Sequence, residues 1–359
     1  ACSLNFRDVL IGMGLYPGDN RELGGDIAGC VTAVGEGVSE LKVGDRVLGV
    51  AGKGLSNEVV VNQTGLCVIQ QELTDCEAAM IPAVWMTVYH ALKHVAVLKG
   101  KESILIHTAT GGVGLAAIRY AKHIGARIYA TAGSERKRQY LREVGIDYVY
   151  DSRSLDYVEK IKVDTKGQGV DVVLNTLTGE GFVEGSLGCC AKSGRFIELS
   201  KRDIWSETEV KAFRSDVNYH IVAIDLLSQE DPLWGAALLQ ELVTWFKDHS
   251  IESSPYVTYP IEETPRALKY LQQARHIGKV VVTSSAQTTG IKPHGQLVSD
   301  GTYLITGGLS GIGWEVVKDL IAQGAKSLAL LSRREADQAL KAEFRKWKKS
   351  GVDVQSYAV

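Results

Sequence analysis

The pattern of apolar and polar positions changes near residue 100. Before that point, short apolar runs are separated by glycines, and the clearest β-rich runs lie at residues 27–34, 45–50 and 58–61. Short runs with glycine turns between them are typical of a small barrel-like β unit. A helical stretch is expected to follow at residues 75–93.

From residue 102 onward, unbroken apolar runs alternate with segments of helical periodicity. We expect strands at 102–108, 127–132, 148–151, 170–177 and 194–199, and helices at 113–124, 135–144 and 232–249. Strands that are apolar throughout are buried on both faces, which indicates a parallel sheet with crossover helices. A late strand at 277–283 is expected to return to the first unit. The predicted fold class is α/β, with a doubly wound, Rossmann-type sheet beside a β-rich domain.

The C-terminal part of the chain begins with a polar stretch at residues 285–299, which we interpret as a linker. A strand, a loop, a helix and another strand follow over 302–333, and then a basic helix at 341–349 and a strand at 352–359. We therefore expect a β-rich domain (1–95 and 250–284), a Rossmann domain (96–249), and the first part of a second Rossmann domain (300–359). The opening residues resemble the middle of a domain, so the β-rich domain is expected to be truncated at its N-terminus.

Composition narrows the class of protein. The chain has 359 residues, of which 45% are hydrophobic, and a formal net charge of -2. A balance this close to neutral argues against binding to nucleic acid or to an anionic membrane. No apolar run approaches the ~18 residues of a membrane-spanning helix. The six cysteines form no CxxC pair, and we interpret them as reduced thiols of a cytoplasmic protein rather than zinc ligands.

The loop after the strand at 102–108 is the first candidate for phosphate binding. Its sequence, TATGGVG at 108–114, leads directly into the next helix. A strand, a tight turn and a helix together direct free backbone N–H groups and the positive end of the helix at a pyrophosphate. Ala109 stands where the strict GxGxxG motif has its first glycine, so a purely structural turn is the alternative. The candidate dinucleotide contacts are Thr110, Gly111, Gly112, Val113 and Gly114.

The end of the following strand predicts which dinucleotide binds. An enzyme that uses NAD places an Asp or Glu there to bond the ribose 2′-hydroxyl. The strand at 127–132 ends without an acid, and Ser134, Lys137 and Arg138 follow it. Cations and hydrogen-bond donors suit a 2′-phosphate, which predicts NADPH. Glu135 opposes this interpretation, and the alternative is that the two cations belong to a solvated helix face.

A second glycine loop lies in the C-terminal part, in the string TGGLSGIG at 306–313. Gly307, Gly311 and Gly313 are its candidate phosphate contacts, and Arg333 follows the next strand, where a 2′-phosphate would lie. The segment that contains this loop has only about sixty residues, which are too few for a complete doubly wound domain.

Three strings carry a resemblance to a known family: LNFRDVL at 4–10, HTATGGVG at 107–114 and HIGKVV at 276–281. Residues 1–285 resemble the enoyl reductase domain of type I polyketide synthases and animal-type fatty acid synthases. That domain belongs to the medium-chain dehydrogenase/reductase superfamily, has a GroES-like substrate domain, and is similar to zinc-free quinone oxidoreductases. Residues 300–359 resemble the start of the ketoreductase domain that follows it in such synthases.

The resemblance implies NADPH-dependent reduction of an enoyl thioester that is carried by an acyl carrier protein. A hydride goes to the β carbon and a proton to the α carbon. The implied partners are the acyl carrier protein and the other synthase domains, within a homodimeric parent synthase. Zinc-dependent relatives have a GHE string, whereas this chain has Gly24, Gly25 and Asp26 there, so no metal is expected.

The resemblance also implies the catalytic residues. Some family members donate a proton from a Tyr in an LNYRD string, but this chain has Phe6, which cannot donate. Lys201 and Asp225 are carried over as the catalytic pair, with a structural salt bridge as the alternative. Asn5, Asn175 and Lys279 are expected at the cofactor. Asn5 could instead anchor its loop, Asn175 could instead form a turn at the end of its strand, and Lys279 could instead be a surface lysine.

Two other functions are open at this point. The chain could be a free-standing NADPH:quinone-type reductase that acts on small enones, although the ketoreductase-like tail argues against that. It could also be an inactive domain that binds the cofactor and serves as a scaffold. Intact glycine loops and cations for a 2′-phosphate argue against an inactive domain.

Overall fold

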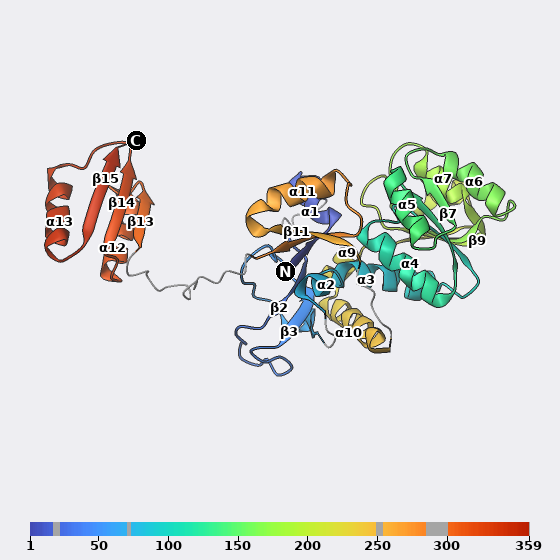
Figure 1. Cartoon of the computed structure of the whole chain (residues 1–359), viewed down its shortest axis with the longest axis horizontal. Coiled ribbons are helices and arrows are strands. Elements are labelled where there is room, and N and C mark those ends of the chain that lie inside the picture. Colours follow the sequence, from blue (N-terminus) through green and yellow to red (C-terminus); the bar gives the residue numbers. More distant parts are fainter. Residues whose placement is uncertain (17–21, 70–72, 249–253, 285–300, 359) are drawn as a thin grey trace. The chain divides into compact units, whose positions relative to one another are not determined.

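The computed structural model describes residues 1–16, 22–69, 73–248, 254–284 and 301–358. The chain divides into two compact units, Ala1–Ala286 and Gln287–Val359 (Figure 1). The predicted linker at 285–299 lies outside the described residues. In the described residues, the first unit contains two six-stranded sheets and the second contains one three-stranded sheet.

The first sheet has the strand order β11-β12-β1-β2-β3-β4. Its strands are β11 (Tyr256–Pro260), β12 (Lys279–Thr283), β1 (Cys2–Leu4), β2 (Asp26–Cys30), β3 (Arg46–Val50) and β4 (Leu66–Val68). Strand β12 thus joins the N-terminal strands as expected, pairing antiparallel with β1. The helices α1 (Phe6–Gly12) and α11 (Thr264–Gln272) contact one another, and their apolar residues form a core with Leu4, Val280 and Val282.

Two local expectations for the first ninety residues are wrong. Residues 58–61 form no strand, and Val60 is fully exposed there. The helix expected over 75–93 is divided into α2 (Asp75–Ala79), α3 (Pro82–Tyr89) and a π-helical turn, η2 (His90–Val95). Pro82 is the physical reason for the first division, because it lacks an N–H and suits the first turn of a new helix.

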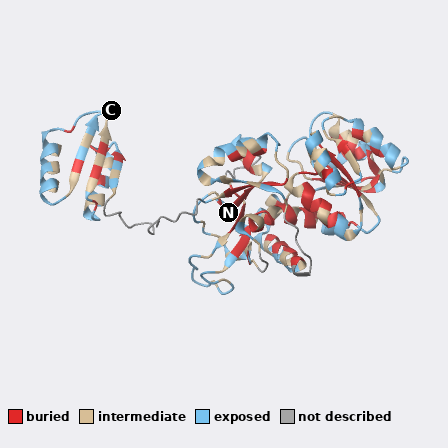
Figure 2. Ribbon diagram, viewed as in Figure 1, coloured by how far each residue is buried: buried red, intermediate tan, exposed pale blue. Residues whose placement is uncertain are grey.

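The second sheet is parallel throughout and has the strand order β10-β9-β8-β5-β6-β7. Its strands are β5 (Ser103–Ile106), β6 (Arg127–Ala132), β7 (Tyr148–Asp151), β8 (Val170–Asn175), β9 (Cys190–Glu198) and β10 (Asn218–Ile221). This is the doubly wound order, in which the chain reverses direction across the sheet between β5 and β8. The structure confirms the predicted α/β class, and Figure 2 shows buried residues along the strands of this sheet.

Helices connect the strands of this sheet. They are α4 (Gly112–Ile124), α5 (Glu135–Glu143), α6 (Asp156–Asp164), α7 (Phe182–Gly188) and α8 (Glu207–Phe213). Helix α9 (Ile224–Glu230) follows β10, the last strand of this sheet along the chain. The long helix α10 (Pro232–Asp248) contacts α3, α9 and β4, so it packs on the side of the first sheet. The described part of the unit also contains the 3-10 turns η1 (Gln63–Gly65) and η3 (Ile261–Glu263).

The second unit has a single parallel sheet in the order β13-β14-β15. Its strands are β13 (Thr302–Thr306), β14 (Ser327–Ser332) and β15 (Asp353–Ala358), and its helices are α12 (Gly311–Ala322) and α13 (Gln338–Lys349). The strand–loop–helix order is the one that the sequence predicts. Its core is formed around Val317, Leu328 and Leu330, which are fully buried.

Candidate active site

The first glycine loop lies between β5 and α4, at the carboxyl edge of the second sheet. Gly111 is the N-cap of α4, and Gly112, Val113 and Gly114 form its first turn. The first turn of a helix leaves backbone N–H groups without partners inside the helix, and these groups attract anions. Because the loop is next to the strand pair where the topology reverses, it has the position of a dinucleotide site in this architecture.

Two glycines of this loop lie in close contacts. A Cβ at Gly114 would lie 2.5 Å from Ala109 Cα, which is backbone and cannot move away. A Cβ at Gly112 would lie 2.5 Å from Cδ of Lys279. Gly114 therefore allows α4 to pack against the end of β5, and Gly112 allows β12 to approach the loop.

The loop is bonded directly to the first sheet. The backbone N–H of Gly278 donates to the carbonyl oxygen of Thr110 at 2.8 Å, and Gly278 forms a bridge with Gly111. Gly278 has φ +78°, and a Cβ there would lie 1.7 Å from the carbonyl oxygen of Pro255. Only glycine fits this position, so the HIGKVV string places β12 against the phosphate-binding candidate.

The predicted 2′-phosphate site lies at the carboxyl end of β6. Ser134 is the N-cap of α5, and its hydroxyl accepts from the backbone N–H of Lys137 at 3.4 Å. Burial, together with the nearby Arg153 and Arg136, lowers the pKa of Lys137. In the described part of the chain Lys137 makes no salt bridge, so its ammonium is available to a phosphate. A cluster of cations whose mutual repulsion is not relieved by a carboxylate fits an anionic ligand.

Arg138 differs from Lys137 because its guanidinium is occupied. It donates to Asp151 Oδ2 at 2.9 Å, to Glu135 Oε2, and to the carbonyl oxygen of Ala132 at 3.0 Å. These bonds join the ends of β6 and β7. They give Arg138 a structural position, and contact with a phosphate stays a prediction.

Arg153 is a cation that the sequence analysis missed. It follows β7, and its Nε lies 3.1 Å from the place where a Cβ of Gly133 would be. Its side chain makes no salt bridge among the described residues. The signal that could have identified it is its place, two residues after the strand that neighbours β6 in the sheet.

Asn5 and Lys279 belong to a buried polar network behind the glycine loop. Lys279 Nζ donates to Asn5 Oδ1 at 2.6 Å and lies 3.7 Å from Asp26 Oδ2, while Asn5 Nδ2 donates to the same carboxylate oxygen at 2.8 Å. The backbone N–H of Ala83 donates to Asp26 Oδ1. Burial raises the pKa of the Asp26 carboxyl and lowers that of the Lys279 ammonium. Lys279 is 5% exposed, so it is not a surface lysine.

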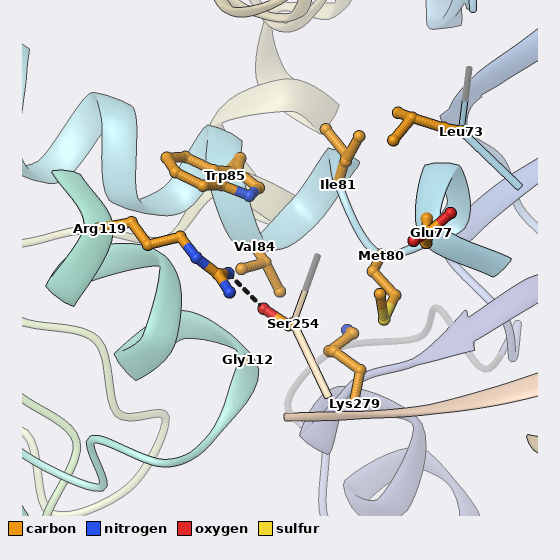
Figure 3. Close-up of a pocket in the computed structure, with 10 residues that line it drawn as sticks. All are labelled: Leu73, Glu77, Met80, Ile81, Val84, Trp85, Gly112, Arg119, Ser254 and Lys279. Atoms are coloured by element: carbon orange, nitrogen blue, oxygen red, sulfur yellow. Dashed lines mark hydrogen bonds between the residues drawn. The ribbon is translucent and has the colours of Figure 1, made fainter. Parts of the chain in front are cut away.

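A pocket lies beside this network, between α3, α4 and β12 (Figure 3). Lys279 and Gly112 form part of its wall, and Met80, Val84 and Trp85 supply apolar surface. Arg119 of α4 donates to Ser254 Oγ at 2.5 Å at the pocket's edge. The remaining lining residues are Leu73, Glu77 and Ile81.

Lys201 and Asp225 lie together, although 24 positions separate them. Lys201 follows β9, Asp225 is in the first turn of α9, just after β10, and Lys201 Nζ donates to Asp225 Oδ1 at 2.7 Å. The side chains are 22% and 23% exposed, so the pair remains accessible from solvent. Burial raises the pKa of the Asp225 carboxyl, but the bonds from Lys201 and Tyr16 outweigh it and hold that pKa below its ordinary value. Because parallel strands end at one edge, the pair shares an edge with the glycine loop.

Asn175 is fully buried at the end of β8. Its Nδ2 donates to Glu198 Oε2 at 2.8 Å and to the carbonyl oxygen of Leu177, and its Oδ1 accepts from the N–H of Leu177. Glu198 Oε1 in turn accepts from the N–H of Ser200, the residue before Lys201. Asn175 thus supports the turn that carries Lys201, and a direct contact with the cofactor stays a prediction.

The second glycine loop is in the other compact unit. Gly307 and Gly311 have positive φ, and Gly311 begins α12. A Cβ at Gly313 would lie 2.3 Å from the carbonyl oxygen of Gly307, which repeats the close contact found at Gly114. Arg333 follows β14, as the sequence predicts.

Gly24, Gly25 and Asp26, which stand where zinc-dependent relatives have the GHE string, include no histidine. Asp26 bonds to Asn5 and to the backbone of Ala83, and Gly25 offers no side chain. Within the described ranges, no three His, Cys, Asp or Glu side chains are grouped so that they could hold a metal ion. The prediction of a metal-free site is still to be tested.

Comparison with protein families divides the chain in the same order as the fold. Residues 1–90 match the alcohol dehydrogenase GroES-like domain, residues 144–282 match the zinc-binding dehydrogenase domain, and residues 301–359 match the KR domain. The first two domains together define the class of medium-chain dehydrogenases/reductases, which has the two-sheet architecture described above.

Individual relatives give a finer result. The CurK enoyl reductase structure has a TM-score of 0.74 and 37% identity, and the match covers 79% of this chain and 88% of that chain. A mycocerosic acid synthase-like polyketide synthase of Mycobacterium tuberculosis is 40% identical over 94% of this chain. This chain spans 16% of the length of that synthase. The chain belongs to the enoyl reductase family of polyketide synthases, and the start of a ketoreductase domain follows the enoyl reductase.

More distant relatives share the fold. The structure of Escherichia coli quinone oxidoreductase complexed with NADPH has a TM-score of 0.69 and 26% identity, over 79% of this chain and 89% of that chain. None of the described helices is both long enough and apolar enough to span a membrane.

Proposed function

We propose that this enoyl reductase domain uses NADPH to reduce the 2,3 double bond of an enoyl thioester held on an acyl carrier protein. The observation that carries the proposal is the shared edge of the second sheet, where the Lys201–Asp225 pair and the glycine loop both lie. A site that transfers a hydride needs the dinucleotide and the proton donor on the same side of the sheet.

Proton delivery is assigned to Lys201. When bound, NADPH supplies the hydride that adds to the β carbon. The α carbon then needs a proton, and the Lys201 ammonium is a charged donor at this edge, held by Asp225 at 2.7 Å. Phe6 carries no transferable proton. An ammonium also stabilises the enolate charge that develops on the thioester oxygen as the hydride adds.

The cofactor's 2′-phosphate is assigned to Ser134, Lys137 and Arg153. Lys137 and Arg153 supply cations that form no salt bridge with a described carboxylate, and Ser134 supplies a hydroxyl at the start of α5. This arrangement favours NADPH over NADH, in agreement with the NADPH complex of the quinone oxidoreductase that shares the fold.

The relatives support the substrate and partner assignments. The chain is similar to polyketide synthases such as the mycobacterial one. The acyl carrier protein and the other synthase domains are therefore the proposed partners. A homodimeric parent synthase stays a prediction. The quinone-type reductase is the second candidate, but its similarity, at 26% identity against 37%, is more distant.

Turnover is the test of the proposed function. We expect NADPH oxidation with a crotonyl thioester of an acyl carrier protein, and much slower oxidation with simple quinones. Faster turnover of quinones would favour the second candidate. Binding of NADPH without any turnover would favour the inactive scaffold.

The cofactor assignment predicts the effect of Lys137→Glu. The new carboxylate would repel a 2′-phosphate, so we expect the affinity for NADPH to fall by roughly tenfold or more while that for NADH changes little. Fluorescence titration with both nucleotides measures this. Lys160→Glu, at an exposed position of α6, makes the same charge change away from the site and is the matched control. Equal losses for both nucleotides would contradict the assignment.

A further inference from the structure

Tyr16 contacts the Lys201–Asp225 pair from the other side of the fold. It follows α1, and its phenol donates a hydrogen bond to Asp225 Oδ2, 209 positions later in the chain. Lys201 Nζ donates to the other oxygen, Oδ1, at 2.7 Å. Each oxygen of the Asp225 carboxylate therefore has its own donor. Tyr16 comes from the part of the first unit that contains the first sheet, and Lys201 comes from the part that contains the second sheet.

Arg7 holds the phenol in place. Its guanidinium carbon lies 5.1 Å from the centre of the Tyr16 ring, in the arrangement of a cation–π contact. Arg7 also donates to the carbonyl oxygen of Glu22 at 3.5 Å, which ties it to the chain before β2. The arginine of the LNFRDVL string thus has a role in orienting a tyrosine nine positions later.

The protonation states of this group are set by its surroundings. Burial, and then the bond to Asp225, raise the pKa of the Tyr16 phenol to about 12, so the hydroxyl stays a donor at neutral pH. The carboxyl it bonds is held in its charged form by Lys201 and Tyr16. Among the described residues, the charged and titratable side chains that act on the pKa of this carboxyl are Lys201 after β9 and Tyr16 after α1, and Arg7 lies behind the phenol.

We propose that Tyr16 is a positioning residue for proton delivery: it fixes the Asp225 carboxylate so that Oδ1 holds the Lys201 ammonium toward the reacting edge of the sheet. The proposal rests on the proposed function. A carboxylate with a single donor can rotate about its Cβ–Cγ bond, whereas one with a donor on each oxygen has a fixed plane. Charge-assisted bonds of this kind are stronger than neutral ones and hold the geometry well.

The chemical consequence concerns the strength of the Lys201–Asp225 bond. The phenol draws part of the negative charge to Oδ2, which weakens the hold of Oδ1 on the ammonium proton. Without the phenol, the carboxylate would bind the ammonium more tightly and in a variable orientation. Transfer of that proton to the α carbon would then be slower, although the nucleotide site would be intact.

The test compares Tyr16→Phe with Tyr259→Phe. Tyr259 is a matched control because it also lies under an arginine, Arg266, at 5.8 Å, and it is in β11 and is not among the groups that shift the pKa of Asp225. Two quantities are measured in each variant and in the wild type: the titration of the Asp225 carboxyl by carbon NMR, assigned with Asp225→Asn, and the kinetics with crotonyl thioester. Thermal unfolding confirms that each variant is folded.

We expect Tyr16→Phe to raise the pKa of the Asp225 carboxyl and to lower kcat by roughly tenfold, with the KM for NADPH unchanged. Tyr259→Phe should change neither. A titration of Asp225 that is the same in Tyr16→Phe and in the wild type would overturn the proposal, and so would a shifted titration with unchanged kcat. A wild type that binds NADPH but reduces no enoyl thioester would contradict the proposed function instead, and the titration would still decide whether Tyr16 acts on Asp225.

Discussion

At the scale of single residues, Gly114 shows how little room the nucleotide loop leaves. A Cβ at this position would lie 2.5 Å from Ala109 Cα and 2.7 Å from its carbonyl oxygen, all of it backbone. Gly112 is less constrained, since its nearest neighbour is the flexible chain of Lys279. The helix and the strand can approach this closely only where a side chain is absent.

Gly114→Ala is therefore expected to displace the first turn of α4 from the end of β5. The steric cost should be about 1–3 kcal/mol of stability, and NADPH affinity should fall with it. Gly188→Ala in α7 is the matched control, because nothing lies within 4 Å of a Cβ there and the position is exposed. Thermal unfolding and NADPH titration measure both effects, and equal results for the two variants would contradict the steric argument.

At the scale of elements, His107 joins the end of β5 to two neighbouring elements, β6 and α7, at the start of the glycine loop. It follows β5, its Nδ1 pairs with Thr131 Oγ1 of β6 at 3.0 Å, and its Nε2 pairs with Ser186 Oγ of α7 at 3.0 Å. Burial lowers the pKa of the imidazole to about 3. The neutral ring is a structural link, and its position is determined by hydrogen bonds on both nitrogens.

This link predicts a specific pH dependence of stability. The unfolded state takes up a proton on His107 below its ordinary pKa of 6.5, whereas the folded state does not until about pH 3. The contribution of His107 to the free energy of unfolding should therefore be fully present above pH 6.5. It should fall as the pH drops toward 3, by up to about 5 kcal/mol. Urea unfolding at several pH values should show a smaller acid loss in His107→Gln. The control is His220→Gln on the exposed strand β10, and an equal acid loss in all three proteins would refute the argument.

At the scale of the whole molecule, the chain consists of two compact units, and each has its own hydrophobic cores. The first unit brings a GroES-like domain and a Rossmann sheet together through Gly278, Lys279 and Tyr16. The second unit contains its own glycine loop. A ligand bound to the first unit stabilises only the elements that it contacts and those that unfold with them.

Unfolding is therefore expected in two steps. NADPH at a hundred times its dissociation constant should stabilise the first unit by about 2.7 kcal/mol. The second unit should respond much less. Calorimetry with and without NADPH measures the two transitions. A single calorimetric transition, in which both units unfold together and NADPH raises its midpoint temperature, would contradict the prediction of two steps.

Local sequence signals were sufficient for several parts of the fold and the site. Strands β6 and β7 lie where the apolar runs predict them. Residues 128–132 of β6 are buried, as expected for an apolar run inside a parallel sheet. The loop at 108–114 was identified from its glycines and from the strand before it. The prediction of a strand at residues 58–61 was wrong because an apolar run forms a strand only if a partner strand is available.

The chain's own sequence thus determined the fold class, the order of the domains and the two glycine loops, since these depend on periodicity and turn chemistry over a few residues. Only the tertiary structure decided which side chains meet. It shows that Arg138 forms a salt bridge with Asp151, whereas Lys137 forms none with a described residue. It also places Arg153 next to Gly133, Tyr16 next to Asp225, and Lys279 next to Asn5. Such contacts join positions up to 274 apart, and the choice of partner depends on packing, burial and charge at a place that no local window of sequence contains.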